Sequence, residues 1–399
     1  MNSEDRRKGR YERRKAKREA AKVNRNKGHD FNRVSSFGAL LRSYYVARKG
    51  VRWKASVQRY GRNVLRNSLN YSRMVRNGKD ITKGFIEFEI NERGKKRQIK
   101  SVHISERVVQ KSVCDYGIVP VMEKSLIYDN GASQKGKGTE HSAQGLIKDL
   151  KEFYRSNGFS NDGYILLGDL HNFFGSIRHD VVEKNTRKAI MDSRLADLTM
   201  SFVYPFGHGL GLGSQVDQIE AVGYANHIDH YIKEVLRCKW YGKYMDDWYI
   251  IAKDKEELKH ILSILRKMYA DIGIELNDKK THITKISHTF VWLQDRYFID
   301  AKGKVVRRPS RKSITRNRVK LKKMARLLDE GKIKYADVRS FYESYKGYMK
   351  HRKGYKAKRN MDKLHNALFI KNWRWQDDQM DVSYGERCDS GHSGYRKAG

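Results

Sequence analysis

Residues 241–253 constrain the fold more than any other stretch, because two adjacent carboxylates, Asp246 and Asp247, separate two short runs of aromatic and β-branched residues. This pattern predicts two strands joined by a tight turn with the acid pair at its tip. Adjacent carboxylates on a rigid turn repel each other unless a cation lies between them. The stretch therefore favours a divalent metal bound by oxygen ligands, although an isolated Asp–Asp pair is more often a solvated turn.

A third carboxylate follows an apolar run farther upstream. Residues 163–168 read GYILLG, which predicts a buried strand ending at Asp169, about 75 residues before the acid pair. Two Mg²⁺ ions roughly 3.5–4 Å apart, held by carboxylates, are the usual device for in-line phosphoryl transfer. We therefore predict that Asp169, Asp246 and Asp247 bind two Mg²⁺ ions, with Mn²⁺ as a substitute.

The charge of the chain indicates a polyanionic partner. The 399 residues include 84 Lys and Arg against 46 acids, a formal net charge of +38, which opposes compaction unless a polyanion neutralises it. Nucleic acid is the expected partner, and a ribosome-associated or merely basic protein is the alternative. The three cysteines are too scattered for a disulfide framework or a zinc site, and no apolar run reaches membrane-spanning length. We expect a cytoplasmic protein with no membrane partner.

Five segments resemble, in order, the palm motifs of reverse transcriptases: YILLGDLHNFFGSI, GLGLGSQVDQIEAVGYANHIDHYIKE, YGKYMDDWYII, GIELNDKKTHI and HTFVWLQDRYF. The resemblance extends over roughly residues 96–350 and is to bacterial and phage members of the family. It implies an α+β right-hand polymerase fold with fingers, palm and thumb, and an RNA-directed DNA polymerase, which is a nucleotidyltransferase. It also places Tyr244 and Met245, next to the catalytic acids, at the substrate.

The resemblance and the composition together predict five regions. They are a basic N-terminal arm at 1–30, N-terminal helices and fingers at 31–162, the palm at 163–303 with a fingers insertion at about 180–207, a helical thumb at 304–380 and a flexible tail at 381–399. The arm is expected to order on RNA or DNA, with a solvated tail as the alternative. Helices are predicted at about 215–233 and, from an apolar face and a capping pair, at 254–273. The hairpin near residues 291–306 resembles the primer grip.

In the fingers, alternation between residues 85 and 99 predicts a hairpin, and residues 105–124 predict a helix broken near Gly117 and Pro120. By resemblance, Arg97 and Arg107 hold the template and the incoming triphosphate, although a simple ion pair is an alternative for Arg107. Glycines between lysines in residues 132–150 let a backbone approach an anion closely.

Three further residues are assigned by resemblance, each with an alternative. Lys135 and Lys137 match a triphosphate-binding loop, or form a plain flexible basic loop. Lys280, or its neighbour Lys279, matches the lysine that protonates the pyrophosphate leaving group.

Phe174 matches the aromatic residue that lies under the sugar in reverse transcriptases and excludes a 2′-hydroxyl. Deoxynucleotides (dNTPs) are therefore the expected substrates. The alternative is that both Phe173 and Phe174 belong to the core, but neighbouring side chains on one element point in different directions.

The second palm motif departs from the usual QGxxxSP pattern. The same register here places Leu212, Gly213, Asp217 and Gln218 at the positions of Gln, Gly, Ser and Pro. Leu for Gln and Gln for Pro resemble diversity-generating retroelement and some defence-associated reverse transcriptases, whereas Asp217 departs from the usual Ser of the diversity-generating pattern. Because Leu212, Gly213 and Gln218 would lie beside the nascent base pair, loss of the polar side chain is predicted to relax nucleotide selection.

The expected role is to copy a dedicated structured non-coding RNA into DNA, in an anti-phage defence system or a diversity-generating retroelement. Its partners would be that RNA, an RNA/DNA primer-template duplex, dNTPs, and an accessory protein or a second copy of the chain. Two alternatives remain at this point. One is an RNA-binding, maturase-like scaffold that does not need catalysis, and the other is a template-independent DNA polymerase of the abortive-infection type.

Overall fold

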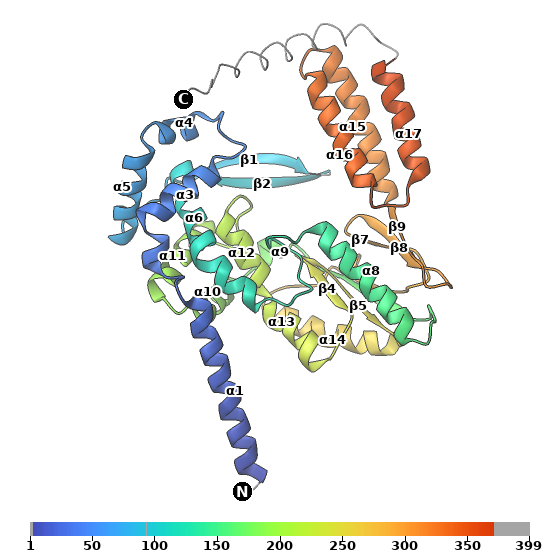
Figure 1. Cartoon of the computed structure of the whole chain (residues 1–399), viewed down its shortest axis with the longest axis horizontal. Helices are drawn as coiled ribbons and strands as arrows, with labels where there is room; N and C mark the ends of the chain where they lie inside the picture. Colours follow the sequence, from blue (N-terminus) through green and yellow to red (C-terminus); the bar gives the residue numbers. More distant parts are fainter. Residues whose placement is uncertain (1–2, 93, 371–399) are drawn as a thin grey trace, which may run out of the picture. The chain divides into compact units, whose positions relative to one another are not determined.

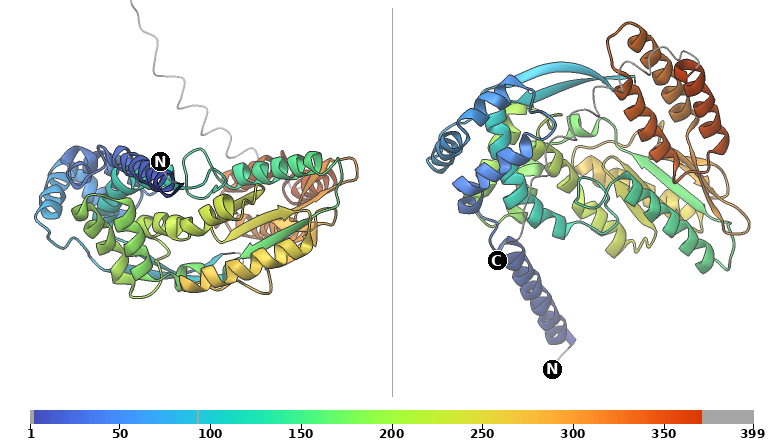
Figure 2. Two further views of the ribbon diagram at one scale, coloured as in Figure 1. Left: turned by 90° about the horizontal axis from the view of Figure 1, so that it is seen from below. Right: turned by 45° about the horizontal axis from the view of Figure 1, so that its top comes forward.

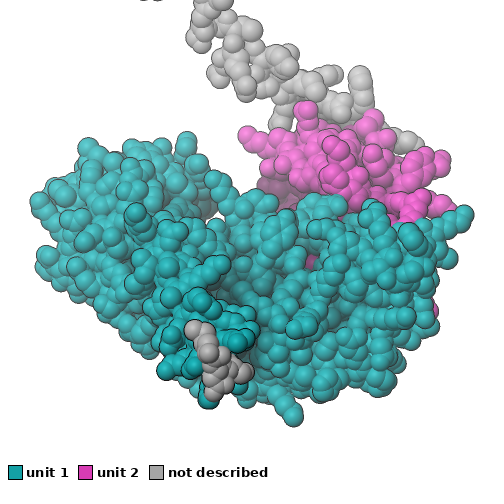
Figure 3. Space-filling model, turned by 60° about the horizontal axis from the view of Figure 1, so that its bottom comes forward, with its two compact units in different colours: residues 1–287, 301–303 teal, residues 288–300, 304–399 magenta. Residues whose placement is uncertain are grey.

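The computed structural model describes residues 3–92 and 94–370. The chain divides into two compact units, the first Met1–Ser287 with Ala301–Gly303 and the second His288–Asp300 with Lys304–Gly399 (Figure 3). The tail predicted at 381–399 lies outside the described residues. Among the described helices, none is both long enough and apolar enough to cross a membrane.

Unit 1 begins with five helices and a hairpin (Figure 1). The helices are α1 (Ser3–Asn26), α2 (Phe31–Val34), α3 (Phe37–Ala47), α4 (Ala55–Arg62) and α5 (Val64–Arg76). Strands β1 (Phe85–Glu92) and β2 (Lys95–Val102) pair antiparallel along their whole length, which confirms the predicted fingers hairpin. The basic strand β2 thereby faces the acidic strand β1, and cross-strand pairs such as Lys96 with Glu89 stabilise it.

The predicted break after the hairpin is a change of helix type. Helix α6 (Ile104–Val113) passes through a π-helical turn (Cys114–Ile118) into α7 (Val119–Met122) and a short 3₁₀ turn, Glu123–Ser125. Gly117 sits in the π turn, where a Cβ atom would lie 3.0 Å from a methyl group of Val34. The missing side chain therefore serves close packing, and the extra residue of the π turn is accommodated without ending the helix.

The palm is a four-stranded antiparallel sheet in the order β4-β5-β3-β6. Its strands are β3 (Tyr164–Asp169), β4 (Tyr241–Tyr244), β5 (Asp247–Ala252) and β6 (His282–Lys285). This confirms the buried strand before Asp169 and the strand–turn–strand around the acid pair. The structure is α+β, as predicted.

Helices cover both faces of this sheet (Figure 2). On one face Trp248 of β5 stacks on Tyr269 of α14 (Lys255–Asp271), with ring centroids 6.4 Å apart. On the other, the Tyr249 hydroxyl donates to Asp149 of α8 (Thr139–Ser156) over 2.8 Å. Burial on both faces explains why β5 reads as a continuous apolar run and not as an alternating one.

The helix predicted at 254–273 is confirmed, because Asp254 accepts a hydrogen bond from the Glu256 N–H and Gly273 follows α14 with a φ of +78°. The helix predicted at 215–233 is interrupted. It consists of α12 (Gln215–Tyr224), α13 (Asn226–His230) and a π turn, Tyr231–Val235. The remaining helices of this unit are α9 (Phe173–Ser176), α10 (His179–Ala189), α11 (Ser193–Val203) and a 3₁₀ turn, Tyr204–Phe206.

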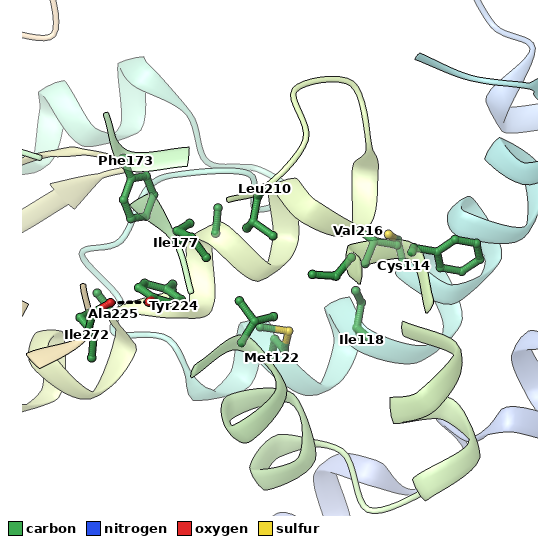
Figure 4. Packing of buried hydrophobic residues seen from close by; sticks show 14 of the residues in the cluster. Cys114, Ile118, Met122, Phe173, Ile177, Leu210, Val216, Tyr224, Ala225 and Ile272 are labelled. Carbon is green, nitrogen blue, oxygen red and sulfur yellow. Dashed lines mark hydrogen bonds between the residues drawn. The ribbon is translucent and has the colours of Figure 1, made fainter. Parts of the chain in front are cut away.

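One hydrophobic core joins the fingers helices to the palm (Figure 4). Cys114, Ile118 and Met122 from the fingers pack in it together with Phe173 and Val216. Within this core the Tyr224 hydroxyl donates to the carbonyl of Ile272 over 2.5 Å, which satisfies a polar group that burial would otherwise make costly. The elements that carry the site are therefore fixed by shared apolar packing.

Unit 2 combines a three-stranded sheet with helices. Strands β7 (Phe290–Trp292), β8 (Asp295–Ile299) and β9 (Val305–Pro309) pair in sequence order. They precede α15 (Arg311–Asp329), α16 (Tyr335–Met349), α17 (Tyr355–His365) and a π turn, Asn366–Ile370. The boundary predicted at 303/304 falls between β8 and β9, whereas the structure groups β7 and β8 with the helices, because β8 forms five residue pairs with β9.

A buried carboxylate connects this sheet to the helices. Asp295 of β8 is fully buried and accepts hydrogen bonds from Arg307 of β9 over 2.7 Å and from Arg352, just after α16, over 2.8 Å. The hydroxyl of Tyr348 donates to it as well, over 2.9 Å. The two arginines and the tyrosine hold this buried carboxylate in place. Its removal leaves two buried cations without a compensating charge.

We predict that Asp295→Ala lowers the free energy of unfolding by about 3–5 kcal/mol, because Arg307 and Arg352 lose their shared partner. Chemical denaturation of the full chain, followed by near-ultraviolet circular dichroism, measures the change. The matched control is Glu343→Ala, which removes a carboxylate that pairs with Lys346 on the exposed face of α16. An equal shift in both variants would show that the buried network is not what stabilises this unit.

Candidate active site

The three predicted carboxylates meet at the end of the central strand. Asp169, the last residue of β3, lies directly opposite Asp247, the first residue of β5. Asp246 stands in the turn between β4 and β5, and its carbonyl accepts a hydrogen bond from Leu170 over 3.2 Å. Met245 has a φ of +56°, a left-handed conformation that a side chain rarely adopts and that the tight turn requires.

Burial and mutual repulsion raise the pKa values of two of these carboxylates. Burial, and then the neighbouring carboxylates of Asp246 and Asp169, raise the pKa of Asp247 to about 7. Burial and Asp169 also raise the pKa of Asp246. The protein alone therefore does not fully compensate the negative charge that it collects here, which is the electrostatic condition for binding a cation.

The loop after α14 secures Asp169 from the other side. The Lys280 ammonium lies 2.5 Å from one carboxylate oxygen, and the Asn277 amide donates to the other over 2.9 Å. The backbone N–H of Asn277 also donates to the Asp169 carbonyl over 2.8 Å. Partial burial disfavours the charge of Lys280, but its bond to Asp169 and the nearby acids raise its pKa overall.

These contacts distinguish Lys280 from its neighbour Lys279 and add Asn277 to the site. Lys280 contacts a predicted catalytic acid, which supports the choice of Lys280 over Lys279. Asn277 was not among the predicted residues, since an Asn before Asp and two Lys is typical of a turn. Only the pairing of its amide with Asp169 identifies it as a positioning residue.

The donor chemistry fits a divalent cation. Three carboxylates offer the oxygen ligands that Mg²⁺ prefers. In residues 3–92 and 94–370, no three His, Cys, Asp or Glu side chains are arranged around one point as a metal site. The two oxygens of Asp169 instead contact Lys280 and Asn277, so metal binding by the three acids stays a proposal.

A cavity of about 890 Å³ opens beside these acids. Asp169 and Asp246 line it, together with Met245, Lys280 and Asn277. Its other lining residues include the β2 side chains Lys96, Arg97, Gln98 and Lys100. An acidic wall thus shares one cavity with a basic strand, whereas Asp247 and Tyr244 form a residue pair in the β4–β5 ladder and are not among the lining residues.

Phe173 and Phe174 both line the same cavity, but Phe173 is also a buried member of the core, whereas Phe174 is only partly buried. Phe173 is buried in the hydrophobic cluster, and the two rings meet edge to face at 5.9 Å. The Phe174 carbonyl also accepts a hydrogen bond from Leu210 over 2.7 Å, which fixes its backbone. Phe174 is therefore the more exposed of the two aromatic residues at the cavity.

A smaller cavity of about 390 Å³ adjoins the first and shares Arg97, Phe174 and Leu212 with it. Arg107, Gly213 and Gln218 complete the predicted residues that line it. The Leu212 carbonyl accepts from the Lys100 N–H over 3.0 Å, which ties this loop to β2. Gly213 has a φ of +124°, and a Cβ there would lie 2.7 Å from the Lys100 carbonyl oxygen, so glycine is needed for this approach.

Asp217 secures the same loop from within. It is fully buried, and its carboxylate accepts from the Gly211 N–H over 2.7 Å. Its own N–H donates to Ser214, the residue that caps α12. At position 217, where the usual motif has a serine hydroxyl, this chain thus has a carboxylate. That carboxylate holds the turn before α12.

The two predicted lysines of residues 132–150 lie outside both cavities, and Arg97 is engaged in an ion pair. Lys135 and Lys137 do not line either cavity. The Lys137 ammonium donates to the carbonyls of Tyr128 and Asn130 over 2.8 and 3.2 Å, within its own loop. Arg97 pairs with Glu92 at 2.9 Å. Binding of a triphosphate by the two lysines stays a prediction.

The antiparallel sheet carries acids at the tip of the β4–β5 hairpin and at the end of the neighbouring strand β3. The basic strand of a second hairpin, β1–β2, lies beside them. This arrangement defines the class of polymerases that transfer nucleotides. Residues 90–296, more than half of the chain, match the family model described as "Reverse transcriptase (RNA-dependent DNA polymerase)". The chain belongs to the reverse transcriptase family, whose enzymes are nucleotidyltransferases. None of the curated protein sequences matches it.

Solved structures that resemble the chain include two telomerases. Apo telomerase from Candida tropicalis, truncated from its C-terminal domain, has 12% sequence identity and a TM-score of 0.44, over 55% of this chain and 54% of that one. Telomerase from Candida albicans in complex with the TWJ fragment of telomeric RNA has 11% identity and a TM-score of 0.46, over 79% of this chain and 66% of that one. The chain thus spans about half to two thirds of the length of these proteins.

We predict that Asp247→Asn is more stable than the wild type at pH 8 in the absence of divalent cations. The pKa of Asp247 is raised to about 7 in the folded protein, so its favourable neutral form is lost as the pH rises from about 4 through 7. The expected gain at pH 8 is about 1–3 kcal/mol and vanishes near pH 4. Thermal melts in EDTA across this range measure it.

The control is Asp278→Asn, which changes an exposed carboxylate paired with Arg266. It is expected to show no gain at pH 8. A pH-independent effect of Asp247→Asn would contradict the repulsion inferred at the end of β3.

Proposed function

We propose that the chain is an RNA-directed DNA polymerase that copies a structured non-coding RNA into DNA. The observation that carries the proposal is the meeting of Asp169, Asp246 and Asp247 at the end of β3, beside a cavity with a basic wall. A triphosphate needs both sides of such a site, since its charge is compensated by basic groups and by cations that acids hold. Membership of the reverse transcriptase family supports RNA as template and DNA as product.

Asp169, Asp246 and Asp247 are the residues that would hold two Mg²⁺ ions, or Mn²⁺ in their place. Such ions, when bound, lower the pKa of a hydroxyl nucleophile and stabilise charge on the transferred phosphoryl group. Arg97 and Lys100 of β2 line the same cavity and would bind phosphate oxygens there. Lys280, whose pKa is raised, is a protonated donor for the pyrophosphate oxygen that leaves.

Phe174 would select the sugar. Its ring lines the cavity that contains Asp169 and Asp246, so a ribose 2′-hydroxyl would compete with it for space. Leu212 lines both cavities and offers no hydrogen bond to a base. We therefore propose deoxynucleotides as substrates and relaxed base selection.

The biological role that we propose is cytoplasmic copying of a dedicated RNA, in anti-phage defence or in a diversity-generating retroelement, with an accessory protein or a second copy of the chain as partner. Leu212 and Gln218, which depart from the usual pattern as those groups do, support this choice. The net charge of +38 supports tight, salt-sensitive binding of RNA.

The test is to purify the protein with the RNA that it carries from its native locus, add Mg²⁺ and the four dNTPs, and sequence the DNA made. We expect DNA complementary to the bound RNA, and at least about a thousandfold less from Asp246→Asn. Asp278→Asn, which changes an exposed carboxylate that does not line the cavity, is the matched control. RNA binding without any DNA would favour a scaffold, and DNA unrelated to the RNA would favour a template-independent polymerase.

We also predict that Phe174→Ala admits ribonucleotides. Removing the ring opens the space that a 2′-hydroxyl needs, so kcat/KM for a ribonucleotide should rise at least about tenfold relative to the matching deoxynucleotide. Single-nucleotide extension of a DNA primer on an RNA template measures both values. An unchanged ratio would mean that another residue excludes the ribose.

A further inference from the structure

Helix α1 is the longest described helix and carries a concentrated charge (Figure 1). Its 24 residues include eleven Lys and Arg and four acids. Most of its side chains are exposed, Tyr11 at 66% among them. Its last residue anchors it to unit 1, because the Asn26 amide donates to the Ala189 carbonyl and accepts from the Met191 N–H.

The charges on α1 are sorted by face. With about 100° of rotation per residue, eight basic residues fall within an arc of roughly 140° that contains no acid. They are Arg6, Arg7, Arg10, Arg13, Arg14, Lys17, Arg18 and Arg25. Asp5, Glu12 and Glu19, spaced seven residues apart, share the opposite side of the helix. We refer to the eight residues as the arginine face.

The kind of cation is sorted as well. All seven arginines of α1 lie on the arginine face, whereas three of its four lysines, Lys8, Lys15 and Lys22, lie outside it. A helix that only needed solubility would gain nothing from this separation. Arginine differs from lysine in its planar fork of donors, which binds phosphate oxygens in pairs and is more weakly hydrated.

We propose that the arginine face of α1 binds the phosphate backbone of a double-stranded segment of the RNA. The identity of the RNA rests on the proposed function, but the surface is separate from the cavity that contains Asp169. A straight helix presents the cations from Arg6 to Arg25 over about 29 Å, and a duplex presents phosphates at a regular spacing over such a length. Double-stranded RNA is recognised mainly through its shape and its phosphates, which suits a face without a base-reading pattern.

Two other partners fit the helix less well. A membrane-surface helix needs an apolar face opposite its cations, but that side of α1 carries Asp5, Glu12 and Glu19. A coiled-coil partner needs an apolar residue every three to four positions, and Tyr11 and Val23 are the only large apolar residues in α1.

The test compares two triple variants of the full chain that remove the same charge. The face variant is Arg10→Gln, Arg14→Gln and Lys17→Gln, and the flank variant is Lys8→Gln, Lys15→Gln and Lys22→Gln. Gln, Lys and Arg have similar helix propensities, so both variants keep the helix equally well. The probes are a synthetic RNA duplex, a single-stranded RNA and a DNA duplex of one sequence, with binding measured from 50 to 300 mM salt.

We expect the face variant to bind the RNA duplex about tenfold more weakly at 150 mM salt, with a salt slope smaller by about 2–3. The flank variant should stay close to the wild type, and single-stranded RNA should distinguish the variants less. Equal losses in both variants would overturn the proposal, because the arm would then act as a diffuse polycation. No loss in either variant, or an equal loss on the DNA duplex, would overturn it too. Binding is measured without nucleotides, so failure of DNA synthesis has no bearing on the result.

Discussion

The repulsion between Asp169, Asp246 and Asp247 is the constraint on which the rest of unit 1 depends. Like charges can be held together only by a scaffold whose other interactions exceed their repulsion. Here β5 supplies buried residues to both faces of the sheet, with Trp248 on α14 and Tyr249 on α8. The acids therefore occupy the end of a strand that is packed on both faces.

The site also requires that the basic strand β2 stays beside the acids, and backbone geometry accounts for this. The loop before α12 is bonded to β2 through the Leu212 carbonyl, and Asp217 holds it from the helix side. Gly213 permits the approach, since a side chain there would collide with Lys100. A change in this loop would thus shift the basic wall and the cavity together, although neither Gly213 nor Asp217 carries any reactive chemistry of its own.

What the sequence predicts well is whatever depends on local periodicity. The β1–β2 hairpin, strand β3 and helix α14 were predicted because alternating or helical spacing records which face is buried. Lys243 illustrates the limit. Within an otherwise strand-like run it would be expected at the surface, yet it is buried and pairs with Asp229 at 3.1 Å, a residue 14 positions earlier.

Asn277 and the π turns escaped prediction for the same reason. The role of Asn277 exists only once β3 brings Asp169 to it, and the π turn at Cys114–Ile118 depends on how Gly117 packs against Val34. The ion pairs of Asp295 in β8 likewise join residues that are distant in sequence, Arg307 and Arg352. Long-range polar pairing leaves no periodic signal, so only the folded chain displays it.

Unit 1 has two complementary charge patterns, one acidic and one basic. At the end of β3, burial and neighbouring carboxylates raise the pKa values of Asp246 and Asp247, which is the electrostatic condition for binding a cation. Basic residues are concentrated on one face of α1 and along β2, where we propose that they bind phosphate. Ligands that bind only the folded chain stabilise it by mass action. A polyanion would therefore reduce the repulsion among the basic residues, and a divalent cation would reduce the repulsion among the acids. Each ligand would favour the folded state in which the other binds.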